Sequence, residues 1–253
     1  SRIPFATANL VTAVTAVRAN CGLSVVSYIF LALAFGWSIL WAFCVVGIID
    51  ATGSCDDPNK PCTYNGGYLF LLFISYFWTH QVIQNTVHVT VAGTVGTWWY
   101  NPEEATSCCS RALMGSFYRA TTLSFGSICL GSLLVAIIQA LRQLVNQARA
   151  DEGDNILLCL AECLLACIEG LVEYFNKWAY IYVGLYGYTY FEAGKNVMTL
   201  FRARGWDNII ADNLVTNALF FTSLGVGLIT GGIGLAIDAG QKSWFNSQGG
   251  AFL

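Results

Sequence analysis

The sequence predicts an all-α membrane protein, a polytopic helical bundle of about five transmembrane helices accompanied by amphipathic interfacial helices. Of the 253 residues, 56% are hydrophobic and 11% are charged, whereas a typical soluble domain has about 25% charged residues. Several uncharged apolar stretches exceed the ~20 residues that cross the hydrocarbon core of a bilayer. The net charge of -3 is small and Lys and Arg form no long run, so no nucleic-acid partner is expected.

The chain divides into a lead-in or interfacial helix at residues 1–22 and a membrane helical domain at residues 23–253. The lead-in lacks the charged n-region, apolar block and cleavage site of a signal peptide. A helix there fits either the membrane surface or the approach to the first span. The predicted spans are 23–49, 68–98, 121–145, 175–195 and 213–237, and an amphipathic helix is predicted at 156–174.

An aqueous loop is predicted between the first two spans, where Gly, Asp, Pro, Asn and Lys gather between Ala51 and Gly67. Cys55 and Cys62 stand seven positions apart in this loop. On an oxidising side of the membrane they are candidates for a disulfide, and otherwise they are two free thiols. The sequence leaves the sidedness open, so both alternatives stand.

The second span has an unusually polar interior. Polar groups at that depth are unfavourable unless they face other helices or a wet cavity, so they mark a candidate functional site. Two alternatives remain for the histidines, which either bind a ligand or are neutral and hydrogen-bonded between helices. A metal site is not expected, because His80 and His88 are eight positions apart. The polar run comprises Trp78, Thr79, His80, Gln81, Gln84, Asn85, Thr86, His88 and Thr90.

A membrane boundary is predicted after the second span, where Trp98, Trp99 and Tyr100 form an interfacial aromatic belt. Cys108 and Cys109 follow as a vicinal pair near this boundary. They are expected to be either palmitoylated or unmodified buried thiols.

The predicted amphipathic helix carries two stripes. Glu162, Glu169 and Glu173 share one narrow face, and Cys159, Cys163 and Cys167 form a second stripe about 100° away. The cysteines have neither CxxC spacing nor an accompanying His, so lipidation or plain packing is expected rather than zinc binding.

The fourth span is rich in tyrosine. Tyr182, Tyr186 and Tyr190 recur every fourth position, which predicts one stripe on a helix, used for packing, interfacial anchoring or ligand contact. Gly184 and Gly187 leave room for a close neighbouring helix. In the last span, Gly227 and Gly231 stand in GxxxG spacing, which is typical of tight helix packing.

Several segments together resemble the choline transporter-like family, which includes the fungal pH-nine-sensitive proteins. They are RIPFA at residues 2–6, GSLLVAIIQ at residues 131–139, the cysteine-studded helix at residues 159–167 and the block at residues 175–196 that begins FNKWAYI. The resemblance covers nearly the whole chain and implies the C-terminal half of a longer membrane domain. It implies a multi-pass membrane protein that transports choline or a related small organic solute.

Choline carries a fixed positive charge without an N–H donor, so its site needs aromatic faces, assisted by an acid or by carbonyl groups. Glu192 could supply the charge, although its spacing of three from Lys195 favours an ion pair with that lysine. The aromatic residues could instead be packing or belt residues. The candidate substrate-binding residues are Tyr76, Trp78, His80, Gln81, Tyr118, Tyr182, Tyr186 and Glu192.

No catalytic function is expected, because the sequence has no P-loop, no HExxH motif and no recognisable nucleophile motif. No cofactor and no metal are predicted. The expected partners are membrane lipids, a small organic cation such as choline, and a second copy or a larger membrane complex. The plasma membrane is the expected location, with an organelle membrane as the alternative. The alternative function is a structural subunit of a larger membrane complex that keeps the fold without transport.

Overall fold

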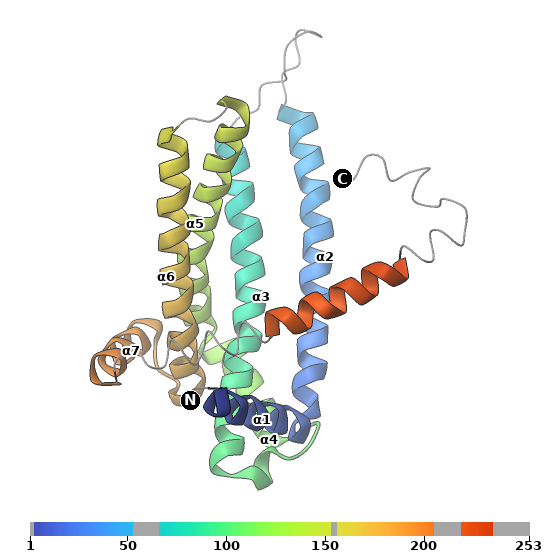
Figure 1. The fold of residues 1–253 in the computed structure, drawn as a ribbon, viewed down its shortest axis with the longest axis vertical. Coiled ribbons are helices and arrows are strands. Elements are labelled where there is room, and N and C mark those ends of the chain that lie inside the picture. The colour runs from blue at the N-terminus through green and yellow to red at the C-terminus, as the bar shows by residue number, and fades with distance from the viewer. Residues whose placement is uncertain (1–2, 53–65, 153–155, 205–218, 235–253) are drawn as a thin grey trace. The chain divides into compact units, whose positions relative to one another are not determined.

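The computed structural model describes residues 3–52, 66–152, 156–204 and 219–234, and within them the ordered elements are all helices (Figure 1). The helices are α1 (Ile3–Ala19), α2 (Cys21–Thr52), α3 (Gly66–Tyr100), η1 (Pro102–Ala105), α4 (Arg111–Tyr118), the π-helical turn η2 (Arg119–Leu123), α5 (Phe125–Glu152), α6 (Ile156–Tyr186) and α7 (Tyr190–Arg204). A further helix covers Leu219–Gly234. Cys55 and Cys62 lie outside the described residues.

The chain forms two compact units, one of Val14–Ala203 and the other of Ser1–Ala13 with Arg204–Leu253. In the second unit the structure describes the start of α1 and the apolar helix Leu219–Gly234. Two described helical stretches are long and apolar enough to cross a membrane, Cys21–Ala51 of α2 and Phe125–Arg149 of α5. The all-α prediction is therefore confirmed, and these two helices agree with a membrane bundle.

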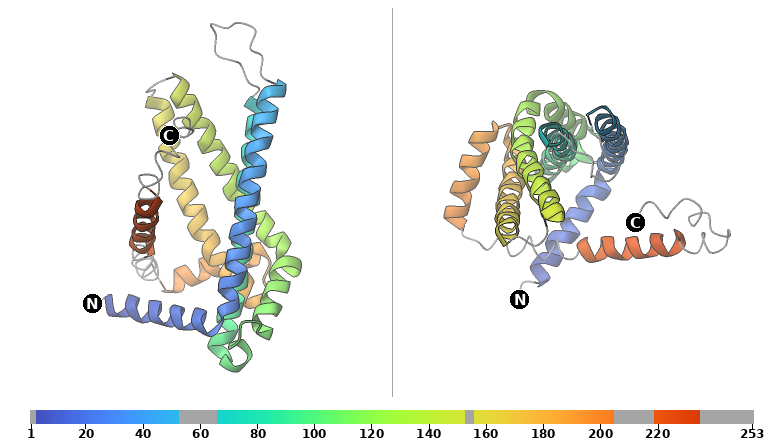
Figure 2. Two further views of the ribbon diagram at one scale, coloured as in Figure 1. Left: turned by 90° about the vertical axis from the view of Figure 1, so that its right-hand side faces the viewer. Right: turned by 90° about the horizontal axis from the view of Figure 1, so that it is seen from above.

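Helix α3 is the central element of the larger unit, where it packs against α2, α4, α5 and α6. The long helices α2, α3, α5 and α6 run side by side in this unit, as two views show (Figures 1 and 2). The short helix α4 and the start of α5 lie at one end, called here the α4 end. The buried core of the unit comprises Val89, Ala120, Ile128, Ala179, Tyr180, Val183, Tyr190 and Ala193.

One continuous helix, α6, replaces the amphipathic helix and the separate tyrosine-rich span that the sequence suggested. No helix-breaking residue separates the two stretches. The polar face of residues 156–174 packs against α5, so this part of the helix does not have to lie at the membrane surface. The helix ends at Tyr186, followed by Gly187 with a φ of 72°. A left-handed residue at this position is typical of a helix terminus. Tyr190 therefore belongs to α7, and the prediction of one stripe through Tyr182, Tyr186 and Tyr190 is wrong for Tyr190.

Helices α3 and α6 approach closely at two glycines. A Cβ atom on Gly184 would lie 2.7 Å from the carbonyl oxygen of Val89, and one on Gly93 would lie 3.0 Å from the carbonyl oxygen of Gly184. Gly184 thus provides the room for a neighbouring helix that the sequence predicted. Gly187 does not, because a Cβ atom there would meet no neighbour within 4 Å.

A disulfide joins Cys21, at the start of α2, to Cys108, which precedes α4. The prediction that Cys108 is palmitoylated or a buried free thiol is therefore wrong, because its sulfur is bonded to a cysteine 87 positions away. Ser110 supports the same junction, since its hydroxyl lies 3.4 Å from Asn20 Oδ1 and also accepts a hydrogen bond from the Leu113 N–H. Cys109 is a free, exposed thiol.

Candidate functional site

A polar cavity of about 320 Å³ lies between α3, α5 and α6. Seven of its eight lining residues are polar or charged, and none of the eight is Phe, Tyr or Trp. Polar groups inside a helical bundle of this composition are arranged to face one another or a solute. The lining residues are Gln81, Gln84, Asn85, His88, Val135, Glu173, Asn176 and Lys177.

Helix α3 contributes Gln81, Gln84, Asn85 and His88 to this cavity. Their spacing of three, one and three positions puts the four side chains on a single helix face. Asn85 is buried and is fixed by two hydrogen bonds, to the Ser132 hydroxyl of α5 at 3.0 Å and to Gln81 Oε1 at 3.4 Å.

The threonines of α3 play a different role from the amides. The hydroxyls of Thr86, Thr90 and Thr94 each donate to the carbonyl oxygen four residues earlier in the same helix. Their hydroxyl donors are therefore satisfied within α3, and none of the three threonines lines the cavity.

Asn176 of α6 forms the wall of the cavity nearest to α7. Its Nδ2 donates to the carbonyl oxygen of Gly131 at 3.0 Å, and its Oδ1 accepts from the hydroxyl of Tyr190. Asn176 and Tyr190 are both buried. The cavity wall is consequently held by groups from α5, α6 and α7 together.

Helices α5 and α6 are joined by three polar pairs along an antiparallel seam. Arg142 pairs with Glu169 at 2.7 Å, and Arg149 pairs with Glu162 at 2.8 Å. These contacts explain the acidic stripe of α6, whose glutamates face α5. The third pair consists of Gln139 Nε2 and Glu173 Oε1 at 3.1 Å, so the acid at the cavity accepts from a neutral amide.

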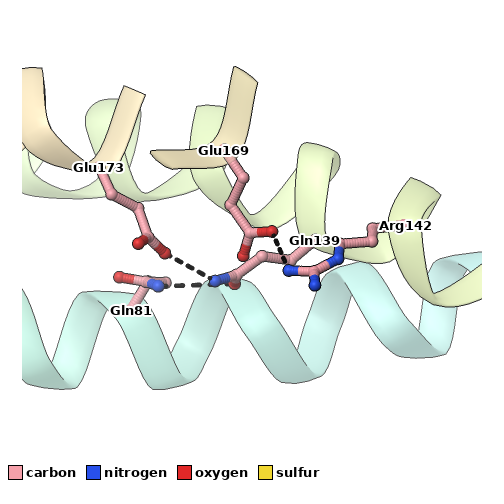
Figure 3. Close-up of polar contacts among 5 residues, drawn as sticks. All are labelled: Gln81, Gln139, Arg142, Glu169 and Glu173. Atoms are coloured by element: carbon pink, nitrogen blue, oxygen red, sulfur yellow. Dashed lines mark hydrogen bonds and ion pairs between the residues drawn. The ribbon is translucent and has the colours of Figure 1, made fainter. Parts of the chain in front are cut away.

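Gln139 also connects Glu173 to α3, because its Oε1 lies 3.5 Å from Gln81 Nε2 (Figure 3). Figure 3 shows Gln81, Gln139 and Glu173 converging from three helices, with the Arg142–Glu169 ion pair beside them. The guanidinium nearest to the cavity is thus engaged by Glu169. The Glu173 carboxyl group lines the cavity and is oriented there by an uncharged partner.

The candidate residues predicted from the sequence do not meet at one place. Gln81 lines the polar cavity. Tyr76 turns toward α2, where its ring lies 4.7 Å from Trp41 and its hydroxyl 3.4 Å from that of Ser38. His80 lines a separate cavity of about 360 Å³, formed with α2 and bordered by Gln84.

The other candidates lie at the surface or bond to backbone. Trp78 Nε1 donates to the carbonyl oxygen of Cys129, and Tyr118 is exposed. The rings of Tyr182 and Tyr186 contact each other at 5.3 Å beside the end of α6. The aromatic candidates predicted from the sequence therefore do not form a single cage in the described structure.

Glu192 acts as the capping residue of α7. Its carboxylate accepts from the N–H of Thr189 at 3.1 Å and from the Thr189 hydroxyl at 2.8 Å. The expected pairing with Lys195 is replaced by this capping box. These hydrogen bonds lower the pKa of Glu192 below its ordinary value.

Sequence reasoning placed the α3 residues of the cavity in a candidate functional run, although it named only Gln81 of them as a substrate-binding residue, and it missed the α6 residues. Glu173, Asn176 and Lys177 were read as parts of an amphipathic stripe and a span, not as ligand residues. A signal for the α3 half existed, because positions 81, 84, 85 and 88 already follow helical spacing. The α6 residues gave no such signal. Three polar residues close together on a helix are also common on ordinary exposed helix surfaces, so their spacing does not indicate a binding site.

The described fold is a bundle of long helices around a polar cavity of about 320 Å³, and two of these helices are long and apolar enough to cross a membrane. The sequence matches the family model described as plasma-membrane choline transporter over residues 1–249, and the chain belongs to that choline transporter-like family.

Three fungal relatives, each called Protein PNS1, illustrate the similarity. The one from Cryptococcus neoformans var. neoformans serotype D is 35% identical over 98% of this chain and 47% of the relative. The one from Yarrowia lipolytica is 36% identical over 87% of this chain and 41% of the relative. The one from Gibberella zeae is 36% identical over 88% of this chain and 43% of the relative. The chain spans about half the length of these relatives.

Proposed function

We propose that this chain contributes to the transmembrane transport of choline or a related small, charged organic solute, and that the cavity between α3, α5 and α6 is the solute site. The observation that carries this proposal is the set of polar side chains from three helices around that cavity. Polar side chains that face an open volume do not stabilise the packing of a membrane bundle, so their presence around this cavity favours a solute-binding role.

The proposal includes five membrane crossings, by α2, α3, α5, α6 and the helix Leu219–Gly234, with α7 outside the crossings. The plasma membrane is the proposed location, in keeping with the family's description. Lipids, the solute, and a second copy or a larger complex are the proposed partners. The role is transport rather than catalysis.

Uptake of radiolabelled choline into vesicles that contain the full chain tests the proposal. Glu173→Gln removes the one acidic residue of the cavity lining. It is expected to lower uptake at least about tenfold, since opposite charges about 4 Å apart attract by about 4 kcal/mol at an effective dielectric constant of about 20. The matched control is Glu103→Gln, because Glu103 is an exposed acid on η1 that is absent from the cavity lining. Its uptake should equal that of the unmodified chain.

The double variant Trp78→Ala and Tyr186→Ala separates the cavity from the aromatic site that the sequence suggested. Unchanged uptake in the double variant, with loss in Glu173→Gln, supports the cavity. Loss in the double variant alone would move the site to the aromatic residues. Absence of uptake in the unmodified chain would favour the alternative, a structural subunit without transport.

A further inference from the structure

We propose that α7 and the adjoining faces of α5 and α6 form a binding site for an anionic phospholipid, with the headgroup phosphate at Lys195 and one acyl chain in the cavity beside it. This cavity has a volume of about 460 Å³ and shares no lining residue with the polar cavity. Of its nine lining residues, Lys195 alone is charged. The site therefore goes beyond the proposed solute site.

The walls of this cavity suit an acyl chain. They include Leu134 of α5 and Leu171, Val172 and Phe175 of α6. Phe175, Val172 and Leu171 lie successively farther from the end of α6, so the apolar wall leads from α7 toward the middle of the long helix. Leu134 and Leu171 are exposed. An apolar hollow excludes water, and on the side of a membrane bundle the acyl chain of a neighbouring lipid fills it.

Helix α7 lies across the direction of the long helices (Figures 1 and 2). Its inner face is fixed to the bundle, since Ala193 and Val197 are buried. It also approaches α6 closely, because a Cβ atom on Gly194 would lie 2.9 Å from Phe175 Cζ. A helix that crosses the direction of the spans in this way is oriented as an amphipathic helix at the membrane surface is, where lipid headgroups lie.

The outer face of α7 combines apolar and basic side chains. Phe191, Lys195, Met198 and Arg202 are four, three and four positions apart, so they share one helix face. All four are exposed. Among the described residues, no acid forms an ion pair with Lys195 or Arg202. Both positive charges are therefore available to a ligand at the mouth of the apolar cavity.

The charge of α7 favours a phospholipid with net negative charge. Glu192, the one acid of this helix, accepts two hydrogen bonds from Thr189. Ammonium and guanidinium groups bind phosphate, and each basic residue near the membrane surface attracts anionic lipids. A phosphatidylcholine headgroup carries a compensating positive charge. It therefore complements Lys195 and Arg202 less well than an anionic headgroup does.

Native mass spectrometry of the full chain in detergent tests the proposal, because it resolves individual bound lipids by mass. The probes are dioleoyl phosphatidylglycerol and dioleoyl phosphatidylcholine, which have the same acyl chains and differ in net charge. We expect the phosphatidylglycerol to bind more tightly. The double variant Lys195→Gln and Arg202→Gln is expected to lower the affinity ratio of the two lipids by about fivefold for each basic residue removed.

The matched control is the double variant Arg18→Gln and Arg111→Gln, which removes the same charge at exposed positions of α1 and α4. Its affinity ratio should equal that of the unmodified chain. Because each ratio is measured on one preparation, a partly misfolded fraction that binds neither lipid does not alter it.

A phosphatidylglycerol with a diazirine in one acyl chain locates that chain after irradiation. We expect the labelled peptides to contain Leu134 or residues 171–175, and the labelling to fall when unlabelled phosphatidylglycerol is added in excess. Glycerophosphoglycerol, which has the same headgroup without acyl chains, should not compete at the same concentration.

Equal affinities of the unmodified chain for the two lipids, or an unchanged ratio in the double variant of Lys195 and Arg202, would overturn the headgroup site. Labelling confined to other helices would overturn the position of the acyl chain. Full competition by glycerophosphoglycerol would show a site for the anion alone and overturn the phospholipid. None of these measurements uses solute uptake, so their failure would leave the proposed function standing.

Discussion

At the residue scale, the Asn176–Tyr190 hydrogen bond links the cavity wall to α7. Asn176 is 3% exposed and Tyr190 is 6% exposed, so the Asn176 oxygen has little access to water if the tyrosine hydroxyl is removed. Asn176 also contacts Gly131 of α5 through its amide nitrogen. One side chain therefore fixes the positions of three helices around the cavity.

We expect Tyr190→Phe to lower the free energy of unfolding by about 1–3 kcal/mol, because it leaves a buried acceptor without its donor. The measurement is thermal unfolding of the full chain in detergent. Tyr186→Phe is the control, since Tyr186 is 60% exposed at the end of α6. Equal stability of the two variants would contradict the role assigned to this hydrogen bond.

At the scale of the element, α6 owes its contact with α3 to Gly184. A methyl group there would lie 2.7 Å from the Val89 carbonyl oxygen and 2.9 Å from the Ala92 Cβ. Both neighbours belong to the rigid helix α3 rather than to a flexible side chain. The two helices would have to move apart to accept it.

We therefore expect Gly184→Ala to destabilise the protein by about 1–3 kcal/mol through overpacking. Gly170→Ala on the same helix should have the opposite sign and stabilise by about 0.5–1 kcal/mol, because a Cβ atom there meets no neighbour within 4 Å. Thermal unfolding of the two variants gives the comparison. A stabilising Gly184→Ala would show that α3 and α6 are not in close contact at this position.

The start of α7 has a pH dependence whose sign follows from the Thr189–Glu192 capping box. Hydrogen bonds from Thr189 lower the pKa of Glu192, so the ionised carboxylate is favoured in the folded helix. Its contribution is present above the carboxyl's ordinary pKa and is lost as the pH falls through the lowered value.

Hydrogen exchange at the first amides of α7 measures this effect. We expect the protection of the unmodified chain to exceed that of Glu192→Gln at neutral pH and to approach it in acid. Thr189→Ala, which removes the hydroxyl that donates to the Glu192 carboxylate, should reduce protection at neutral pH. A difference between the unmodified chain and Glu192→Gln that grows in acid would contradict the assigned sign.

At the scale of the whole molecule, the Cys21–Cys108 disulfide ties α2 to the α4 end across 87 residues of sequence. Most of α2 is exposed in the structure, and it packs against α3 and contacts α4 through Phe30 and Phe117. A covalent bond at its first residue therefore restrains a helix that has few other neighbours among the described elements.

We expect Cys108→Ser to destabilise the unit Val14–Ala203 by about 2–4 kcal/mol, because a crosslink between distant residues restricts the unfolded chain. Cys109→Ser, at the adjacent exposed free thiol, should change the stability by less than about 0.5 kcal/mol. Thermal unfolding with and without reductant provides the measurement. If reductant left the unmodified chain unchanged, the disulfide would not contribute to stability.

The all-α membrane class, the approximate extent of α2 and α3, and the family were all predictable from the amino-acid sequence. These properties follow from apolar runs, helical periodicity and local motifs, each of which is contained within one segment of chain. The sequence also shows which α3 residues are polar and that Glu162, Glu169 and Glu173 share a face. The residues of each stripe could therefore be predicted, but the helix that each stripe contacts could not.

Which helix faces meet could be seen only in the folded chain. The ion pairs of Arg142 with Glu169 and of Arg149 with Glu162 depend on how α5 and α6 face each other. Glu173 became a site residue because the fold places Gln139 and Gln81 beside it. A cavity and a long-range disulfide depend on the relative rotation of helices far apart in the chain. That rotation is set by packing among many side chains, and no local pattern in the sequence encodes it.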